Sequence, residues 1–243
     1  MTALRILLIA GYTIVLGSAA MFVTLLRPRG HLFRPFARSW SWLVCRTCGV
    51  RTSARRDPLY DPSRAALYIA NHQSLFDIPA LILAMPIDVR MVAKRELLFI
   101  PVFGWSLWLA GFVFVDRRDR ARAIRSMDKA VTRLRAGQSI AVFAEGTRSP
   151  DGRMLPFKKG GFILAQQAGV PVVPVAIRGG HAVLPKGSLR LRPGTMEVVF
   201  DAPIDTRSFP PEARDALIQV VRDRISALLE AGDGQDPGAI RST

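Results

Sequence analysis

Residues 66–84 read ALYIANHQSLFDIPALILA, two apolar runs joined by a polar segment. The first run, 66–70, has the apolar and aromatic side chains typical of a buried strand, and residues 78–84 suit a short helix. Asn71 and Ser74 favour a turn between the two, with Ser74 as the residue that caps the helix. A strand, a turn and a helix in this order predict a layered α/β fold with a largely buried sheet.

The same alternation continues toward the C-terminus. We expect further strands at 89–93, 112–115, 139–144, 170–177 and 196–200, and further helices at 120–135, 160–168 and 211–229. Pro171 and Pro174 lie inside one of these strands, and because proline cannot donate to a ladder, we expect that strand to be irregular or at an edge. Residues 59–230 form the predicted globular domain, and the small, polar residues 231–243 a flexible tail.

The N-terminal region predicts a membrane anchor over residues 1–58. Residues 6–26 carry no charged side chain, and at about 1.5 Å per residue such a helix reaches across a hydrocarbon core of about 30 Å. Residues 27–56 contain several arginines and no acidic residue. Because positive charge marks the cytoplasmic side of a membrane segment, we expect the chain after residue 27 to lie in the cytoplasm. Residues 40–50 predict a short interfacial helix. A buried core helix is the alternative for 6–26, and spanning or lying in the membrane are both open.

Charge and composition limit the class of partner. Lys and Arg exceed Asp and Glu by 15, and hydrophobic residues make up 49% of the 243 residues. The balance excludes a disordered chain and predicts a polyanionic partner. High charge together with high apolar content favours an anionic membrane surface over nucleic acid, although a membrane-tethered nucleic-acid-binding protein is kept as the alternative from another class. The arginines at 117–135 suit either a solvated helix or contact with anionic lipid or an acidic carrier protein.

Cys45 and Cys48 form a lone CxxC pair. A structural zinc site needs four ligands, and the sequence offers neither a second cysteine pair nor a close histidine pair. The surrounding arginine- and tryptophan-rich stretch also lacks the strand-to-helix setting of a thioredoxin-like site. We therefore interpret the pair as incidental and expect no metal.

Polar residues come directly after several of the expected strands, where ligands bind in α/β folds. His72 and Asp77 can meet only across a turn, and there they would form a base with an orienting carboxylate, able to take a proton from a hydroxyl. Residues 111–117 deliver Arg117 at the end of a strand. Residues 145–149, EGTRS, offer a glycine for close approach and the guanidinium of Arg148 for a phosphate.

Together these segments resemble the four ordered motifs of the bacterial 1-acylglycerol-3-phosphate acyltransferases. The resemblance rests on Asn71-His72 with Asp77, on 111–117, on 145–149 and on the Val-Pro run at 170–175, and it covers about residues 60–205. It implies a mixed, mostly parallel sheet flanked by helices, a basic membrane-binding face and an N-terminal helical anchor. It also implies a location at the inner membrane, with the catalytic domain on the cytoplasmic side.

The resemblance further implies the reaction and the roles of residues. A fatty acyl group passes from acyl-CoA or acyl carrier protein to the sn-2 hydroxyl of lysophosphatidate, with His72 as general base and Asp77 holding it. Substrate binding falls to Lys94, Arg117, Glu145, Gly146, Thr147 and Arg148. No cofactor is expected, because the thioester is already activated. Glycerol 3-phosphate or another lyso-lipid is the alternative acceptor, and residues 97–115 are either a wall for the acyl chain or ordinary core.

Overall fold

The computed structural model describes residues 3–26, 32–116 and 119–231. One seven-stranded sheet has the order β1-β7-β6-β2-β5-β3-β4. The strands are β1 (Val50–Arg56), β2 (Leu67–Ala70), β3 (Arg90–Lys94), β4 (Val113–Val115), β5 (Ile140–Phe143), β6 (Val172–Arg178) and β7 (Gly194–Phe200). All neighbours are parallel except β6 and β7, which are antiparallel. The prediction of a mixed, mostly parallel sheet is confirmed.

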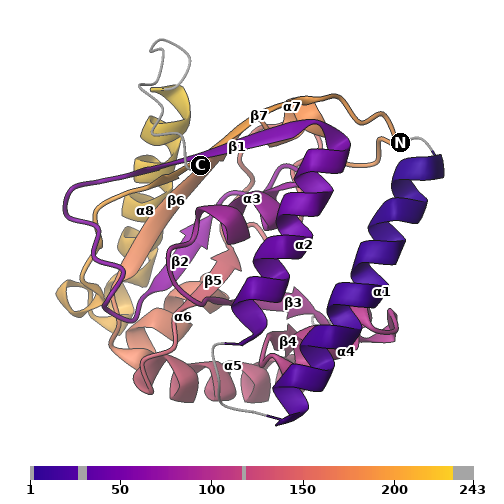
Figure 1. The fold of residues 1–243 in the computed structure, drawn as a ribbon. Helices are drawn as coiled ribbons and strands as arrows, with labels where there is room; N and C mark the ends of the chain where they lie inside the picture. The colour runs from indigo at the N-terminus through magenta and orange to yellow at the C-terminus, as the bar shows by residue number, and fades with distance from the viewer. Residues whose placement is uncertain (1–2, 27–31, 117–118, 232–243) are drawn as a thin grey trace.

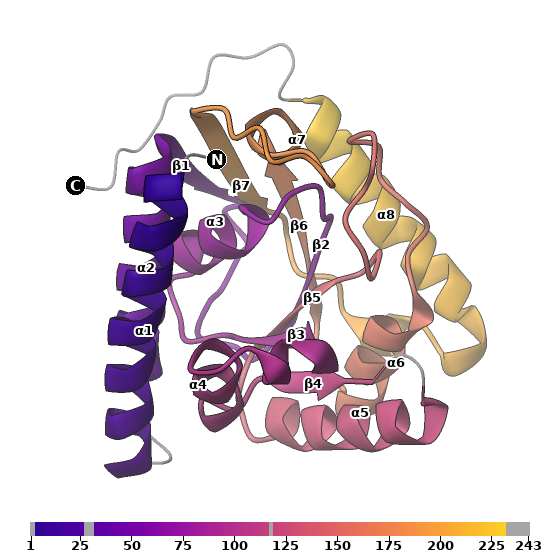
Figure 2. The same cartoon turned by 90° about the vertical axis from the view of Figure 1, so that its right-hand side faces the viewer.

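Helices cover both faces of this sheet (Figure 1). The α-helices are α1 (Ala3–Leu26), α2 (Phe33–Cys48), α3 (Asp77–Ala84), α4 (Phe103–Leu109), α5 (Arg120–Arg135), α6 (Lys159–Ala168), α7 (Gly180–Val183) and α8 (Arg214–Glu230). Short 3₁₀ turns occupy Arg95–Phe99, Thr206–Ser208 and Pro211–Ala213. Figure 2 shows α1 and α2 side by side at one flank of the molecule and α8 at the opposite flank.

Strand β2 lies at the centre of the sheet, and every one of its side chains is buried. Tyr68 and Ala70 belong to the core on the α2 and α3 face. Leu67 and Ile69 belong to the core on the α5, α6 and α8 face. A strand buried on both faces needs an uninterrupted apolar run, and this explains why residues 66–70 are recognisable from the sequence.

Strand β6 decides between the two expected alternatives: it lies between β7 and β2, so it is not an edge strand, but it is irregular. Val175 pairs with Phe200, whereas Val172 forms a bridge with Ile204. Between these two pairs the β7 side is one residue longer than the β6 side, which is the geometry of a β-bulge. Pro174 lies opposite this bulge, where a missing N–H group costs no regular ladder bond.

Strand β1 corrects the expected boundary after residue 58. Residues Val50–Arg56 pair in parallel with Gly194–Phe200 along their whole length, so they belong to the sheet and not to an anchor. The sequence of this strand, VRTSARR, is mostly polar, because an edge strand buries little of its surface, and it therefore lacks the apolar signal. The expected tail, 231–243, lies outside the described residues apart from Ala231.

Helix α2 is longer than the interfacial helix expected at 40–50, and its inner face is part of the core. Phe33, Val44, Cys45 and Cys48 are buried, and burial raises the pKa of the Cys45 thiol to about 12. Both cysteines are free thiols. The pair therefore serves packing against the sheet, with its thiols in the unreactive protonated form.

Helix α1 packs against α2 and α4 with one side only. Trp40 Nε1 donates to Thr13 Oγ1 at 2.9 Å, and the hydroxyls of Tyr12 and Thr47 are 3.2 Å apart. The helix is long and apolar enough to cross a membrane. Its other side exposes large apolar side chains, namely those of Leu4, Ile6, Leu7, Leu8, Ile14, Val15, Phe22, Leu25 and Leu26.

Candidate active site

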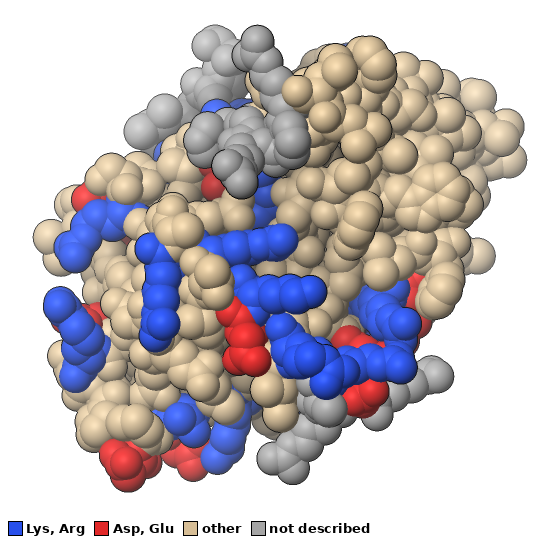
Figure 3. Space-filling view, turned by 90° about the horizontal axis from the view of Figure 1, so that it is seen from below, with Lys and Arg blue, Asp and Glu red and all other residues tan. Residues whose placement is uncertain are grey.

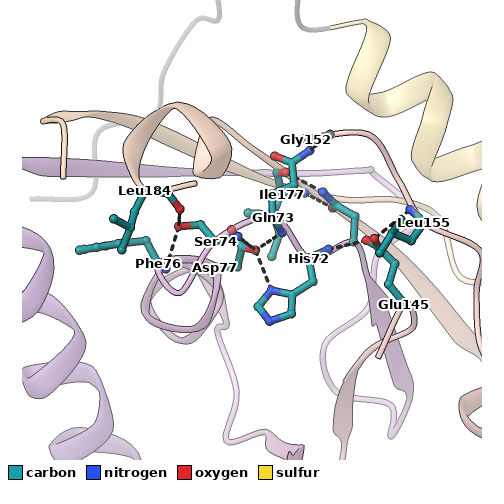
Figure 4. A network of polar contacts seen from close by, with 11 residues as sticks. His72, Gln73, Ser74, Phe76, Asp77, Glu145, Gly152, Leu155, Ile177 and Leu184 are labelled. Carbon is teal, nitrogen blue, oxygen red and sulfur yellow. Dashed lines mark hydrogen bonds and ion pairs between the residues drawn. The ribbon is translucent and has the colours of Figure 1, made fainter. Parts of the chain in front are cut away.

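The site forms where the carboxyl ends of three neighbouring strands meet. β2 lies between β5 and β6 and is parallel to both, so the loops that come after these strands lie at one edge of the sheet. The β2 loop carries His72, the β5 loop carries Glu145, and the β6 loop continues into α7. Figure 4 shows residues of all three loops in one network of polar contacts.

His72 and Asp77 are brought together as predicted. His72 Nδ1 lies 2.8 Å from Asp77 Oδ2, across the turn that leads from β2 into α3 (Figure 4). The Asp77 side chain is fully buried, and that of His72 is 14% exposed. With Nδ1 facing the carboxylate, Nε2 is the nitrogen left to accept a proton from a substrate.

Asp77 also holds the turn itself. Its Oδ2 atom accepts hydrogen bonds from the backbone N–H groups of Gln73 at 2.6 Å and Ser74 at 2.8 Å. Ser74 does not cap α3 as expected: its hydroxyl accepts from Phe76 N and donates to the Leu184 carbonyl. Asp77 therefore stabilises the turn that brings it to His72, because its carboxylate accepts hydrogen bonds from the backbone between the two residues.

Glu145 acts on the same turn from the β5 loop. The residue is 2% exposed, and its two carboxylate oxygens accept from His72 N at 2.7 Å and Leu155 N at 2.9 Å. Burial raises the pKa of Glu145, and the two backbone N–H groups partly offset this. Both oxygens are thus used within the protein, one to position the backbone of His72 and the other that of Leu155.

The predicted cations differ in how the structure places them. Lys94 is exposed at the end of β3, while Arg148 is half-buried in the β5 loop. Neither side chain has a hydrogen bond or ion pair to another described residue, and an uncompensated, half-buried guanidinium is what an anionic ligand needs. Arg117 lies outside the described residues. Thr147 is exposed, and Gly146 has a φ of 72°, which a glycine adopts without strain.

A sequence model of the acyltransferase domain matches residues 50–178, from the start of β1 to the end of β6. The chain belongs to the Acyltransferase family. The matched residues include the whole His72 turn and the β5 loop, and the match ends before the loop that leads from β6 into α7.

Individual relatives of this acyltransferase carry a more specific name. The 1-acyl-sn-glycerol-3-phosphate acyltransferase of Limnanthes alba is 38% identical over 66% of this chain and 57% of its own length. The human 1-acyl-sn-glycerol-3-phosphate acyltransferase alpha is 37% identical over 72% of this chain and 62% of its own length. The chain thus spans about three fifths of these relatives.

A solved structure resembles nearly the whole acyltransferase. The 1-acyl-sn-glycerophosphate (LPA) acyltransferase of Thermotoga maritima has a TM-score of 0.77 and 28% identity, over 98% of this chain and 100% of its own. The likeness therefore includes the N-terminal helices as well as the sheet.

Sequence reasoning missed several residues that complete the site of this acyltransferase. Phe143 stacks on the His72 ring, with centroids 4.0 Å apart and planes 15° from parallel. Gln73 Nε2 donates to the Gly152 carbonyl at 2.8 Å and so joins the β2 and β5 loops. One signal in the sequence could have pointed to the loop after β6. It is the pair Gly179-Gly180, because two glycines at a strand end indicate that the backbone lies close to another group.

Proposed function

We propose that this acyltransferase transfers a fatty acyl group from an acyl thioester to the sn-2 hydroxyl of lysophosphatidate, giving phosphatidate. The observation that carries the proposal is the contact between His72 Nδ1 and the buried Asp77 carboxylate, which leaves Nε2 available as a base. The names of the relatives and of the Thermotoga maritima structure support the choice of acceptor.

The proposed transfer is direct, without an acyl-enzyme. The sn-2 hydroxyl donates its hydrogen bond to His72 Nε2, and the proton moves to the imidazole as the oxygen attacks the thioester carbonyl carbon. The carbon–sulfur bond then breaks, and the leaving thiolate takes the proton back from the imidazolium. Asp77 stabilises this imidazolium and keeps the ring in the required tautomer.

The acceptor's phosphate is proposed to bind the cations of the neighbouring loops. Arg148 is the best placed of these, because it is half-buried, lacks a partner among the described residues and shares its loop with Glu145. A guanidinium donates two parallel hydrogen bonds to a phosphate. Lys94 and Arg117 are proposed as additional contacts, with Gly146 and Thr147 forming the wall of the β5 loop.

The membrane is proposed to bind the face formed by α1 and its neighbours. The exposed apolar side of α1 is joined by exposed aromatic side chains of α4 and of the turn before it, namely Phe99, Trp105 and Trp108. Figure 3 shows Lys and Arg gathered over one part of the molecular surface beside an uncharged area. Apolar and basic surfaces side by side suit an anionic membrane.

The packing of α1 favours lying in one leaflet over crossing the bilayer. α1 contacts both α2 and α4, so it is bound along the side of the globular domain (Figures 1 and 2). A crossing helix that kept these contacts would carry the charged domain into hydrocarbon, at a cost of several kcal/mol for each charge. We place this anchored domain on the cytoplasmic side of the inner membrane, where acyl-CoA and acyl carrier protein are both at hand.

The test is incubation of the purified chain with lysophosphatidate, glycerol 3-phosphate and a lyso-aminolipid, each with acyl-CoA and with acyl carrier protein as donor. We expect phosphatidate from lysophosphatidate, identified by mass spectrometry, and loss of that product in His72→Ala. A clear preference for glycerol 3-phosphate would replace the proposed acceptor. Activity that survives His72→Ala undiminished would remove the proposed base.

A further inference from the structure

Lys186 occupies a fixed position at the rim of the site, on a loop that none of the acyltransferase-like motifs includes. It lies at the tip of the turn after α7, where Ser188 N donates to the Pro185 carbonyl at 3.2 Å and Gly187 has a φ of 80°. This turn directs the lysine away from the core, and the residue is exposed.

The loop that carries Lys186 is attached to both of the other site loops. Ser74, two residues after His72, donates its hydroxyl to the Leu184 carbonyl at 2.9 Å. Lys186 Nζ itself donates to Thr147 Oγ1 at 3.2 Å. The ammonium therefore contacts the residue adjacent to Arg148, and its loop is held to the turn of His72.

The positive charges of Lys186 and Arg148 are not neutralised by an acidic side chain of the described residues. The contact of Lys186 with Thr147 is to a neutral hydroxyl, and in the described part of the chain neither Lys186 nor Arg148 forms an ion pair. A phosphate monoester carries about −1.5 to −2 near neutral pH. Arg148 supplies one of the positive charges that such a group needs, and Lys186 offers a second one beside the same loop.

The chemistry of the ammonium group also fits. It has three donors, and one is used on Thr147, so two remain for phosphate oxygens. Lys94 lies at the end of β3, on the far side of β5 from β2. Lys186 comes after β6, on the opposite side of β2, and its ammonium group reaches the β5 loop from that side.

We propose that Lys186 binds the phosphate of the acceptor and selects phosphorylated over unphosphorylated acceptors. This inference rests on the proposed function, because it takes lysophosphatidate as the acceptor. It assigns Lys186 a binding role at the rim and leaves the proton transfer to His72.

The experiment measures steady-state kinetics of the full chain with lysophosphatidate and with a monoacylglycerol of the same chain length. Lys186→Gln removes the charge but keeps a donor for Thr147, and we expect about a tenfold rise in the KM for lysophosphatidate, the scale of one charged hydrogen bond. The donor KM and the rate with monoacylglycerol should change less than about twofold. Lys186→Arg, which keeps the charge, should restore most of the affinity.

Arg190→Gln is the matched control, because it removes the same charge from the same exposed loop, where the structure shows only a backbone contact of Arg190 with Ser188. It should leave the acceptor KM unchanged. If Lys186→Gln matches this control, or affects both acceptors equally, the lysine has no role in phosphate binding. The unmodified chain distinguishes this failure from failure of the proposed function, since only the latter predicts no phosphatidate at all.

Discussion

Gly180 lies directly against the Asp77 carboxylate: a methyl group on this glycine would come within 2.4 Å of Asp77 Oδ1 and 3.1 Å of the Ser74 Cβ atom. Oδ1 is buried and has no hydrogen-bond partner among the described residues, so nothing else fixes that side of the carboxylate. The first residue of α7 thus sets how deeply Asp77 can sit behind His72.

We expect Gly180→Ala to lower kcat by at least about tenfold, because the added methyl group must push Asp77 away from its contacts with the turn. The KM values for both substrates should change little, since Gly180 lies behind the histidine. Steady-state kinetics together with the thermal midpoint test this. Gly11→Ala, at an exposed helical glycine of α1 with open space around it, is the control, and wild-type kcat in Gly180→Ala would contradict the expectation.

His72 and Asp77 should behave as one unit. His72→Ala removes the base and is expected to lower the rate by about 10²–10⁴-fold. Because Asp77 acts through His72, the double alanine variant should be scarcely slower than His72→Ala alone. Single-turnover rates of the three variants measure this, with circular dichroism to check that each is folded. Losses that multiply in the double variant would mean that the two residues act independently.

The raised pKa of Glu145 predicts a pH-dependent stability. Its ordinary value is 4.5, and burial raises the folded-state value, so the folded protein binds this proton more tightly than the unfolded chain does. The contribution of Glu145 to the free energy of unfolding should therefore fall as pH rises from 4.5 through the raised pKa, and then level off. Denaturant unfolding of the wild type and of Glu145→Gln across about pH 4–8 gives this contribution as a difference. A difference that grows with pH would show that the backbone hydrogen bonds outweigh burial.

Arg148→Lys should weaken acceptor use because lysine keeps the charge but loses the planar two-pronged donor. The expected loss is about 1–3 kcal/mol in the kcat/KM for lysophosphatidate, with the donor KM nearly unchanged. The loss should shrink for an acceptor without phosphate. Equal losses with both acceptors would mean that Arg148 supports the β5 loop, and the phosphate contact would pass to Lys94 or Arg117.

We expect the chain to fold when it is truncated to begin at residue 32 but not when it begins at residue 59. A chain beginning at Leu32 lacks α1 only, and we expect it to stay folded and to lose most of its binding to anionic vesicles. A chain beginning at Leu59 also lacks α2 and β1, which exposes the buried core, and we expect it to aggregate. Vesicle sedimentation and thermal unfolding compare the two. Undiminished vesicle binding without α1 would assign the anchoring to α4 and the basic surface.

The parts of the fold that sequence reasoning reached are those with strong local signals. The central strand at 67–70 is apolar throughout because it is buried on both faces, and the His72 turn contains its own orienting residue. β1 gives no such signal, because an edge strand tolerates polar side chains. Pro171 and Pro174 leave an edge strand and an irregular strand both open, because nothing in the sequence marks the bulge that lies opposite Pro174.

The role of Glu145 needed the structure for a different reason. Its partners, His72 N and Leu155 N, are backbone groups, which no side-chain pattern records. A carboxylate in the EGTR segment suggests a group that faces a ligand, whereas its two oxygens face the protein. Gly180 is similar, because its close contact with Asp77 joins residues that are far apart in the sequence.

The surroundings of the His72 ring limit the order of events in the proposed reaction. Phe143 covers one face of the ring, and Asp77 occupies its Nδ1 edge, so Nε2 is the ring nitrogen open to the acceptor hydroxyl. In the proposed direct transfer this nitrogen carries only the acceptor's proton and no acyl group, so donor and acceptor must be bound at the same time. Double-reciprocal plots at several fixed donor concentrations should then intersect, whereas parallel lines mark a ping-pong sequence. By covering one face of the imidazole, the aromatic side chain at the end of β5 thus restricts the directions from which the acceptor of the proposed reaction can reach Nε2.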